Sequence, residues 1–202
     1  YFVSPENGDE TKDESTEVRA VNPDGTGVGY VGDKLCKFDF NTGGYTDLGV
    51  NEPALANTMS TDGSVIGGYA WDESTYMQHP IYLKDGVKYD LPMPTSTWLG
   101  YEANGFGLTG ANADGSMFLG YVQDDFAAYP ICVWVLNQDG KTYSVIPVSK
   151  RFYDSSIELK GPQPMDYFNG AFMSANGRWV ALSVHNKDNT EQSYTLARYE
   201  VL

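Results

Sequence analysis

Residues 62–72 read Asp-Gly-Ser-Val-Ile-Gly-Gly-Tyr-Ala-Trp-Asp, and residues 114–124 read Asp-Gly-Ser-Met-Phe-Leu-Gly-Tyr-Val-Gln-Asp. A shorter copy of the phrase occupies residues 24–33, and a weaker copy that has lost the Gly-Tyr pair begins at Asn176. Each copy joins a turn dipeptide to an apolar strand, which ends in a small residue, an aromatic residue and then an acid or amide. One supersecondary unit is therefore used repeatedly, and this repetition decides the architecture.

Each repeat is predicted to contain up to four antiparallel strands. Asp-Gly between two β-rich segments is a strong hairpin signal, because a type I′ turn requires positive φ at both central residues. A second tight turn, such as Asp85-Gly86, leads from the third strand to the fourth, and the last repeat lacks a fourth strand. The predicted first strands are residues 17–21, 54–59, 107–112 and 170–174, the second strands 27–31, 64–70, 116–122 and 178–184, and the third strands 35–40, 80–84, 130–136 and 194–199.

The second strand of each repeat is apolar on both faces, as residues 65–66 and 117–119 show. A strand that is covered on both faces predicts sheets that stack face to face, and sheets stacked around an axis form a β-propeller. Gly29, Gly68 and Gly120 are interpreted as positions where adjacent sheets would otherwise crowd. The predicted fold class is all-β, a propeller-like array of about four four-stranded antiparallel blades, which is either a small closed ring or part of a larger propeller.

The chain is divided into an acidic leading segment, residues 1–16, and a single repeat domain, residues 17–202. The blades are placed at residues 17–50, 51–92, 105–147 and 168–202. The acid-rich composition of the leading segment favours a solvated loop, with an acidic docking arm as the alternative. Tyr1-Phe2-Val3 is a candidate closing strand for the last blade. The alternative is that the chain is the C-terminal part of a larger ring.

The formal net charge of −14 disfavours nucleic acid and anionic membranes as partners. The sequence contains no run of 18 apolar residues, so no transmembrane segment is predicted. Cys36 and Cys132 are predicted to be small buried residues, with a free reactive thiol or a bridge as alternatives.

The repeated phrase, Asp-Gly-Ser, three residues, Gly-Tyr, then an aliphatic strand, an Asp-Gly turn and a closing Tyr-x-Leu, is similar to HAF-type extracellular repeats and less closely to the repeats of TolB-like propellers. The similarity covers residues 17–202 and is greatest at residues 58–92 and 110–147. The resemblance implies a bacterial, extracytoplasmic protein (secreted, periplasmic or a surface-anchored lipoprotein) without an assigned chemistry. The fourth copy departs from the pattern, since it lacks Gly-Tyr and the Asp.

Long loops are predicted on one edge of the sheets and tight glycine turns on the other. Long loops on a rigid scaffold usually carry binding, and aromatic rings with carboxylates suit a glycan or a protein partner. The alternative is that these aromatic residues pack onto the edge of the core. The candidate ligand-binding residues are Trp71, Asp72, Tyr76, His79, Trp98, Tyr101, Asp124, Asp125, Tyr153 and Asp154.

Three functions follow, of which non-catalytic binding of a protein or carbohydrate through the long-loop edge is favoured. The second is a carbohydrate-active enzyme that uses two loop carboxylates about 5–10 Å apart. The third is a structural spacer within a larger surface protein. No nucleophile–base set, metal site or cofactor motif is predicted. The carboxylates considered for the enzyme are Asp72, Asp124, Asp125, Asp154 and Asp166.

The acid or amide that closes each copy of the phrase has two interpretations. Such residues usually cap turns by accepting hydrogen bonds from their own backbone, and this is the interpretation that we favour. A cation such as Ca²⁺ bound by a ring of carboxylates is the alternative. The four residues are Asp33, Asp72, Asp124 and Asn186.

Overall fold

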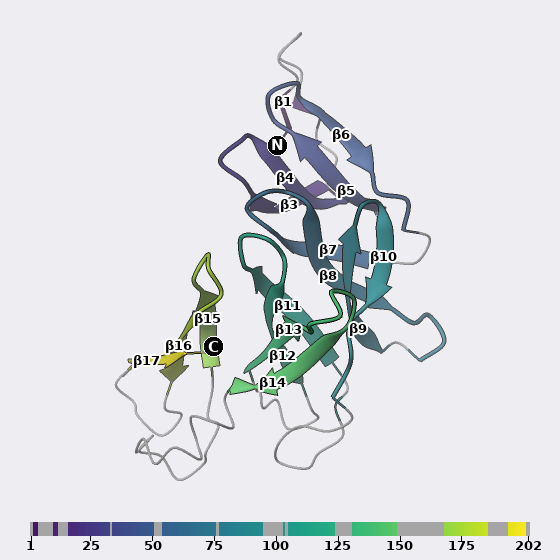
Figure 1. Cartoon of the computed structure of the whole chain (residues 1–202). Helices are drawn as coiled ribbons and strands as arrows, with labels where there is room; N and C mark the ends of the chain where they lie inside the picture. Colours follow the sequence, from purple (N-terminus) through teal and green to yellow (C-terminus); the bar gives the residue numbers. More distant parts are fainter. Residues whose placement is uncertain are drawn as a thin grey trace.

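The computed structural model describes residues 2–3, 10–11, 16–32, 34–50, 54–75, 77–94, 103, 105–123, 131–148, 168–185 and 194–200. The regular elements in these ranges are β-strands, and all pairs are antiparallel (Figure 1). Blade 1 contains β3 (Thr16–Val21), β4 (Thr26–Val31), β5 (Lys34–Asp39) and β6 (Gly44–Asp47). Blade 2 contains β7 (Ala54–Met59), β8 (Val65–Trp71), β9 (Gln78–Lys84) and β10 (Val87–Asp90). Blade 3 contains β11 (Gly105–Ala111), β12 (Met117–Gln123), β13 (Ile131–Leu136) and β14 (Tyr143–Pro147). Blade 4 contains β15 (Phe168–Met173), β16 (Trp179–His185) and β17 (Tyr194–Glu200).

Each blade is an up-and-down sheet whose strands lie in sequence order, as the repeats predict. The sheet of blade 4 has three strands in the described residues. The short strand β1 (Phe2–Val3) pairs with β2 (Glu10–Thr11), with Phe2 opposite Thr11, rather than with β17. Of the candidate closing strand, the described residues Phe2–Val3 therefore pair with β2 and not with blade 4.

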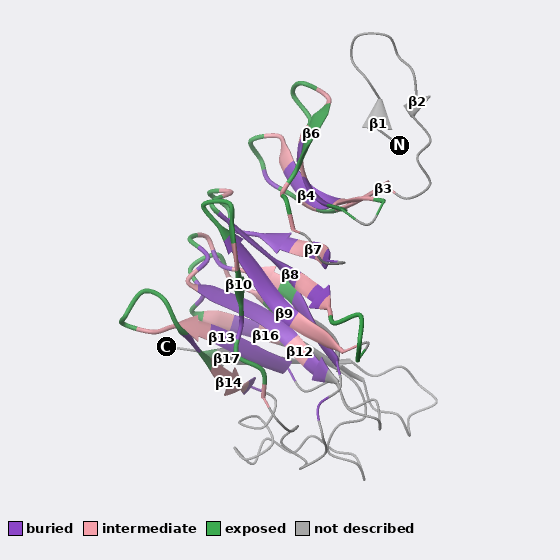
Figure 2. Ribbon diagram, turned by 90° about the vertical axis from the view of Figure 1, so that its right-hand side faces the viewer, coloured by how far each residue is buried: buried purple, intermediate pink, exposed green. Residues whose placement is uncertain are grey.

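The blades stack face to face, and the second strand β8 is mostly buried (Figure 2). The second strand of a blade contributes to two cores at once. In β8, Ile66 joins the cluster shared with blade 1, whereas its neighbour Val65 joins the cluster shared with blade 3. In β12, Phe118 packs toward blade 2 and Met117 packs toward blade 4. The prediction of a strand apolar on both faces is confirmed, because successive side chains leave a strand on opposite sides. We call the face turned toward the next blade in sequence the forward face.

The turns between first and second strands differ from the predicted type I′ geometry. Gly25, Gly63, Gly115 and Gly177 have φ of 83°, 70°, 68° and 70°. Among the described residues other than glycine, Asp85 alone has positive φ, at 54°, so Asp85-Gly86 is the dipeptide with both residues in that region. The first turns are longer. Ser60 Oγ accepts a hydrogen bond from the Val65 amide (2.9 Å) and donates one to Asp62 Oδ1 (2.6 Å), which closes the loop without a second residue at positive φ.

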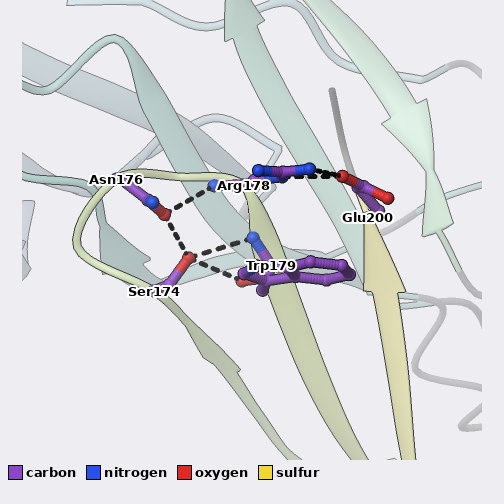
Figure 3. Close-up of polar contacts among 5 residues, drawn as sticks. All are labelled: Ser174, Asn176, Arg178, Trp179 and Glu200. Carbon is purple, nitrogen blue, oxygen red and sulfur yellow. Dashed lines mark hydrogen bonds and ion pairs between the residues drawn. The ribbon is translucent and has the colours of Figure 1, made fainter.

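The same side-chain closure recurs in the other blades. In blade 3, Asn112 Oδ1 accepts from the Met117 amide at 2.9 Å. In blade 4, Ser174 Oγ accepts from the Trp179 amide at 2.9 Å and donates to Asn176 Oδ1 at 2.8 Å (Figure 3). Blades 2–4 thus share a polar residue two positions before the Asp or Asn of the turn, which satisfies a backbone N–H that would otherwise lack a partner.

The first turns also hydrogen-bond to one another across the blades. Asn22 Nδ2 donates to Ser60 O (2.9 Å), and the Asp62 amide donates to Ala113 O (3.3 Å). The Ala113 amide donates in turn to Ala175 O (2.7 Å). This series of turn-to-turn bonds holds the same edge of all four sheets together.

The glycine of the Gly-Tyr pair has a different role from the predicted relief of crowding between sheets. A Cβ at Gly68 would overlap the carbonyl oxygen of Leu55, which belongs to the neighbouring strand of the same blade. Gly29 faces Glu17 O in the same way, and Gly120 meets its own blade's β11 backbone. The cause is a β-bulge in the first strand, where one residue has no partner and the two backbones approach closely. The prediction was therefore wrong about the crowding partner, although it identified positions without space for a side chain.

The fourth blade supports this explanation, because its bulge has moved. In blades 1–3 the unpaired residue lies three positions before the polar residue that opens the turn, for example Asn57 before Ser60. In blade 4 the unpaired Asn169 lies five positions before Ser174. Leu182 and Ser183 stand where the other blades have Gly-Tyr. The glycine is absent from the blade in which the bulge lies elsewhere.

Both cysteines are free and buried, in blades 1 and 3, which confirms the prediction of small buried residues. Burial raises the pKa of Cys132 to about 12, so this thiol is held in its protonated form.

Gly67 and Gly68, two neighbouring glycines of β8, provide a test of the role assigned to the β-bulge. Gly67 faces blade 3, where a Cβ would lie 2.9 Å from Phe118 Cε1 and 3.1 Å from Leu108 Cδ1, both ends of side chains. We expect Gly67→Ala to lower the free energy of unfolding by about 1–3 kcal/mol, because these side chains shift at modest cost. Gly68→Ala forces apart two paired backbones, and we expect a loss of about 4 kcal/mol or failure to fold. Urea unfolding compares them, and equal losses would contradict the bulge assignment.

The turn carboxylates predict a dependence of stability on acid. Hydrogen bonds from Ser60 and Ser64 lower the pKa of Asp62 from 3.8, and hydrogen bonds from Ser116 lower that of Asp114. A carboxyl with a lowered pKa in the folded state contributes stability above its unfolded-state value, about 4, and loses it as the pH falls through the folded-state pKa. We expect the urea midpoint to be level from pH 7 to 5 and to fall below pH 4. Asp62→Asn, which copies the Asn176 turn, should make that fall shallower. If the urea midpoint of Asp62→Asn falls below pH 4 as steeply as that of the wild type, Asp62 does not contribute to the acid dependence.

Candidate functional site

The edge opposite the hydrogen-bonded turns carries a cluster of aromatic side chains at the inner strands. The tyrosine of the Gly-Tyr pair follows the bulge glycine in three successive blades, as Tyr30, Tyr69 and Tyr121. These tyrosines are half-buried and lie near the ends of β4, β8 and β12. Because the second strand runs away from the first turn, its end lies at the long-loop edge. The first strands β3, β7 and β11 pack side by side, which brings the three tyrosines toward one another.

In blade 1, Tyr30 belongs to a group of three polar contacts. Its hydroxyl donates a hydrogen bond to Glu17 Oε2, which is directly opposite in β3. Arg19 Nε lies 2.6 Å from Glu17 Oε1, and the Arg19 guanidinium carbon lies 5.9 Å from the centre of the Tyr30 ring. The hydrogen bond to Glu17 is the main cause that raises the pKa of Tyr30. The Arg19 and Glu17 side chains are 38% and 43% exposed, so the pair is accessible to a ligand.

Tyr69 occupies the middle of the cluster. Burial raises its pKa first, and the nearby hydroxyl of Tyr121 raises it further, while the Arg19 cation lowers it. The Tyr69 ring lies 5.0 Å from the ring of Trp71, with an angle of 76° between the planes. Both residues are on the forward face of β8, since alternate residues of a strand share a face. We define the inner aromatic cluster as Tyr30, Tyr69, Trp71 and Tyr121, together with the Glu17–Arg19 pair.

The unpaired residues of the three bulges occupy equivalent positions in the inner strands: Arg19 in β3, Asn57 in β7 and Thr109 in β11. Asn57 Oδ1 is buried and, among the described residues, is the one buried side-chain oxygen or nitrogen without a hydrogen-bond partner. A buried amide oxygen without a donor costs about 1–3 kcal/mol of stability. The bulges thus place polar side chains on the inner strands where the fold does not use all of their hydrogen-bonding groups.

Two of the predicted site residues, Asp72 and His79, do not join Trp71 in the inner aromatic cluster. Asp72 is exposed and caps its own loop: its Oδ1 accepts from the Ser74 amide at 2.7 Å and the Ser74 hydroxyl at 2.5 Å, which lowers the pKa of Asp72. The capping interpretation is confirmed at this position. His79 pairs with Ala70 in the register, so it lies on the face of blade 2 opposite to that of Trp71. Its Nε2 lies 3.6 Å from Asp90 Oδ1 on the outer strand β10.

The other predicted site residues lie outside the described residues, as do three of the four expected turn caps and Asp166. These residues are Tyr76, Trp98, Tyr101, Asp124, Asp125, Tyr153 and Asp154, with Asp33 and Asn186. In blade 1 the second and third strands are close in sequence, as the predicted bounds 27–31 and 35–40 imply, because β4 ends at Val31 and β5 begins at Lys34. Among the residues that the structure describes, no three His, Cys, Asp or Glu side chains are close enough to hold a metal ion. In the same residues, no helix is long and apolar enough to span a membrane.

Sequence reasoning missed Glu17, Arg19, Tyr30, Asn57, Tyr69 and Tyr121 as site residues. The signal was present in the repeated Gly-Tyr pair, which was used to derive the architecture. The glycine has a structural cause in the bulge, and the tyrosine after it is half-buried. Of the three tyrosines, Tyr121 also packs against the core that blades 3 and 4 share. The recurrence of a tyrosine at one position of the repeat was the available sign, but the sequence alone does not show that its copies lie near one another.

The comparisons with known proteins show the fold. No protein-family model matches the sequence, and no curated protein matches it. TolB from Acinetobacter baumannii superposes with a TM-score of 0.57 and 14% identity, over 92% of this chain and 41% of TolB. The tricorn protease gives 0.55 and 11%, over 92% of this chain and 21% of that chain. The β-propeller domain of the Trilobed protease from Pyrococcus furiosus gives 0.52 and 10%, over 91% and 54%. The chain thus spans about two fifths of the TolB that it resembles, and its four stacked sheets have the β-propeller fold.

Proposed function

We propose that this chain is a non-catalytic, extracytoplasmic binding module that holds a protein or carbohydrate partner at its long-loop edge. The observation that supports the proposal is the difference between the two edges. At the turn edge, the carboxylates of Asp62 and Asp114 accept hydrogen bonds from their own turns. At the opposite edge, the inner aromatic cluster presents half-buried rings beside an accessible ion pair. Aromatic residues and arginine supply much of the binding energy at recognition sites.

The charge of the chain agrees with such a partner. A net charge of −14 disfavours phosphate-rich ligands, whereas it permits a neutral or basic one. The extracytoplasmic location rests on the resemblance to HAF-type repeats, and it is part of the proposal.

Asp72, the candidate catalytic carboxylate within the described residues, does not favour the enzyme alternative. A glycoside hydrolase needs a general acid whose pKa is raised. Hydrogen bonds from Ser74 lower the pKa of Asp72 instead, and they hold its carboxylate in a turn. Asp72 therefore has the properties of a structural cap.

The test compares the wild type with two double variants. The site variant is Tyr69→Ala with Trp71→Ala, and the matched control is Tyr45→Ala with Tyr89→Ala, whose rings are 56% and 43% exposed on outer strands. Each is used as bait on a glycan array and on extracts of bacterial surface proteins, after its melting temperature has been measured. We expect the wild type and the control to retain a partner that the site variant binds at least about tenfold more weakly.

Two results would contradict the proposal. If the site variant retains the partner as well as the control does, the inner aromatic cluster is not the binding surface. If the wild type retains neither protein nor glycan, the structural spacer becomes the better explanation of this chain.

A further inference from the structure

We propose that the inner aromatic cluster binds a neutral saccharide, with one sugar ring against Tyr69 and Trp71 and its hydroxyl groups on the Glu17–Arg19 pair. This inference rests on the proposed function and specifies its ligand. The occupant is a pyranose unit of a neutral oligosaccharide. A protein partner at the same edge is the competing outcome of the test.

The arrangement of the two rings on β8 suits a sugar. The Tyr69 and Trp71 ring centroids lie 5.0 Å apart with an interplanar angle of 76°, an edge-to-face contact in which the two ring planes are nearly perpendicular. A pyranose has an apolar face formed by its C–H groups and a rim of hydroxyl groups. Its C–H face can pack on one ring while its rim lies along the other. Tyrosine and tryptophan also offer a polar group at the end of an apolar ring, which such a mixed surface requires.

The Glu17–Arg19 pair favours a ligand without charge. Arg19 makes two contacts with the carboxylate, Nε to Oε1 at 2.6 Å and Nη2 to Oε2 at 3.1 Å, so the two charges compensate each other. A charged ligand group would have to compete with this pair. A hydroxyl group can instead donate to the Glu17 carboxylate and accept from the guanidinium N–H groups that Glu17 does not occupy, because Arg carries five donors. The overall charge of −14 further disfavours acidic sugars.

Asn57 gives an independent indication of a polar ligand. Its amide oxygen is buried without a donor on β7, the first strand of the blade that carries Tyr69. An unsatisfied amide does not stabilise the fold, so the polar character of this bulge residue has no structural explanation in the described contacts. The two ends of an amide are exchanged by rotation about χ2. In the proposed complex, the Asn57 oxygen accepts a hydrogen bond from a sugar hydroxyl.

The experiment titrates the full chain with defined hexasaccharides: cello-, laminari-, xylo-, manno-, malto- and chitohexaose, with hexagalacturonate as the acidic comparison. Calorimetry measures affinity and tryptophan emission reports Trp71. We expect at least one neutral hexasaccharide to bind, and to change the emission. Trp71→Phe should keep the affinity within about threefold and lose most of the emission change. Tyr69→Ala and Arg19→Met should weaken binding at least about tenfold, whereas Tyr89→Ala on the outer strand β10 should bind as the wild type does.

Asn57→Leu separates binding from folding. We expect this variant to unfold at the same urea concentration as the wild type or higher, because it removes an unsatisfied buried oxygen, and to bind the hexasaccharide at least about threefold more weakly. A structural role for Asn57 would lower the urea midpoint instead.

The outcomes distinguish this inference from the proposed function. If no neutral hexasaccharide binds, or if hexagalacturonate binds more tightly than the neutral sugars, the inference is overturned. If in addition the wild type captures a protein that the Tyr69/Trp71 variant loses, the proposed function stands with a protein as its ligand. If a neutral hexasaccharide binds equally to the wild type and to Tyr69→Ala, the sugar site lies elsewhere and the inference is again overturned.

Discussion

The burial of both faces of each second strand is the interaction on which the rest of the structure depends. Val65 and Ile66 are neighbours in β8, yet they enter two different hydrophobic clusters, one on each side of the sheet. Burial of apolar side chains is the main favourable contribution to folding. A single sheet of this kind cannot satisfy both faces, because one face would stay in water. The blades therefore stabilise one another, and stability is shared along the array as in other repeat proteins.

The stacked sheets are also joined to one another along one edge. The turn edge is held by hydrogen bonds between successive first turns, such as the bond from Ala113 N to Ala175 O at 2.7 Å. In blades 2–4 the side chain of a Ser or Asn closes the loop of the first turn. In all four first turns the Asp or Asn of the dipeptide accepts a backbone hydrogen bond. This edge uses its polar groups for its own structure. The acids of these turns, Asp24, Asp62 and Asp114, accept hydrogen bonds from their own turns.

The bulges of the first strands connect the fold to the proposed site. Each bulge brings the first and second strands so close that only glycine fits, at Gly29, Gly68 and Gly120. The same irregularity leaves one residue of each inner strand without a partner, and it precedes the tyrosine that faces the next blade. Bulges are often found where a sheet redirects a side chain for function. Here one backbone feature accounts for a repeated glycine and also for the polar and aromatic residues beside it.

The repeat in the sequence was sufficient to predict the all-β class, the strand positions and the stacking of sheets, because hairpin signals and two-sided apolar strands are local properties of the chain. The burial of both cysteines followed from the same pattern. The turn type and the reason for the Gly-Tyr pair did not follow, because a bulge depends on the register between two strands and leaves no distinct local signature. The proximity of Tyr30, Tyr69 and Tyr121 was likewise beyond sequence reasoning, since these residues lie about 40 to 50 positions apart and come near one another only when three blades stack. Distance along the chain hides such a site, and the packing of neighbouring sheets creates it.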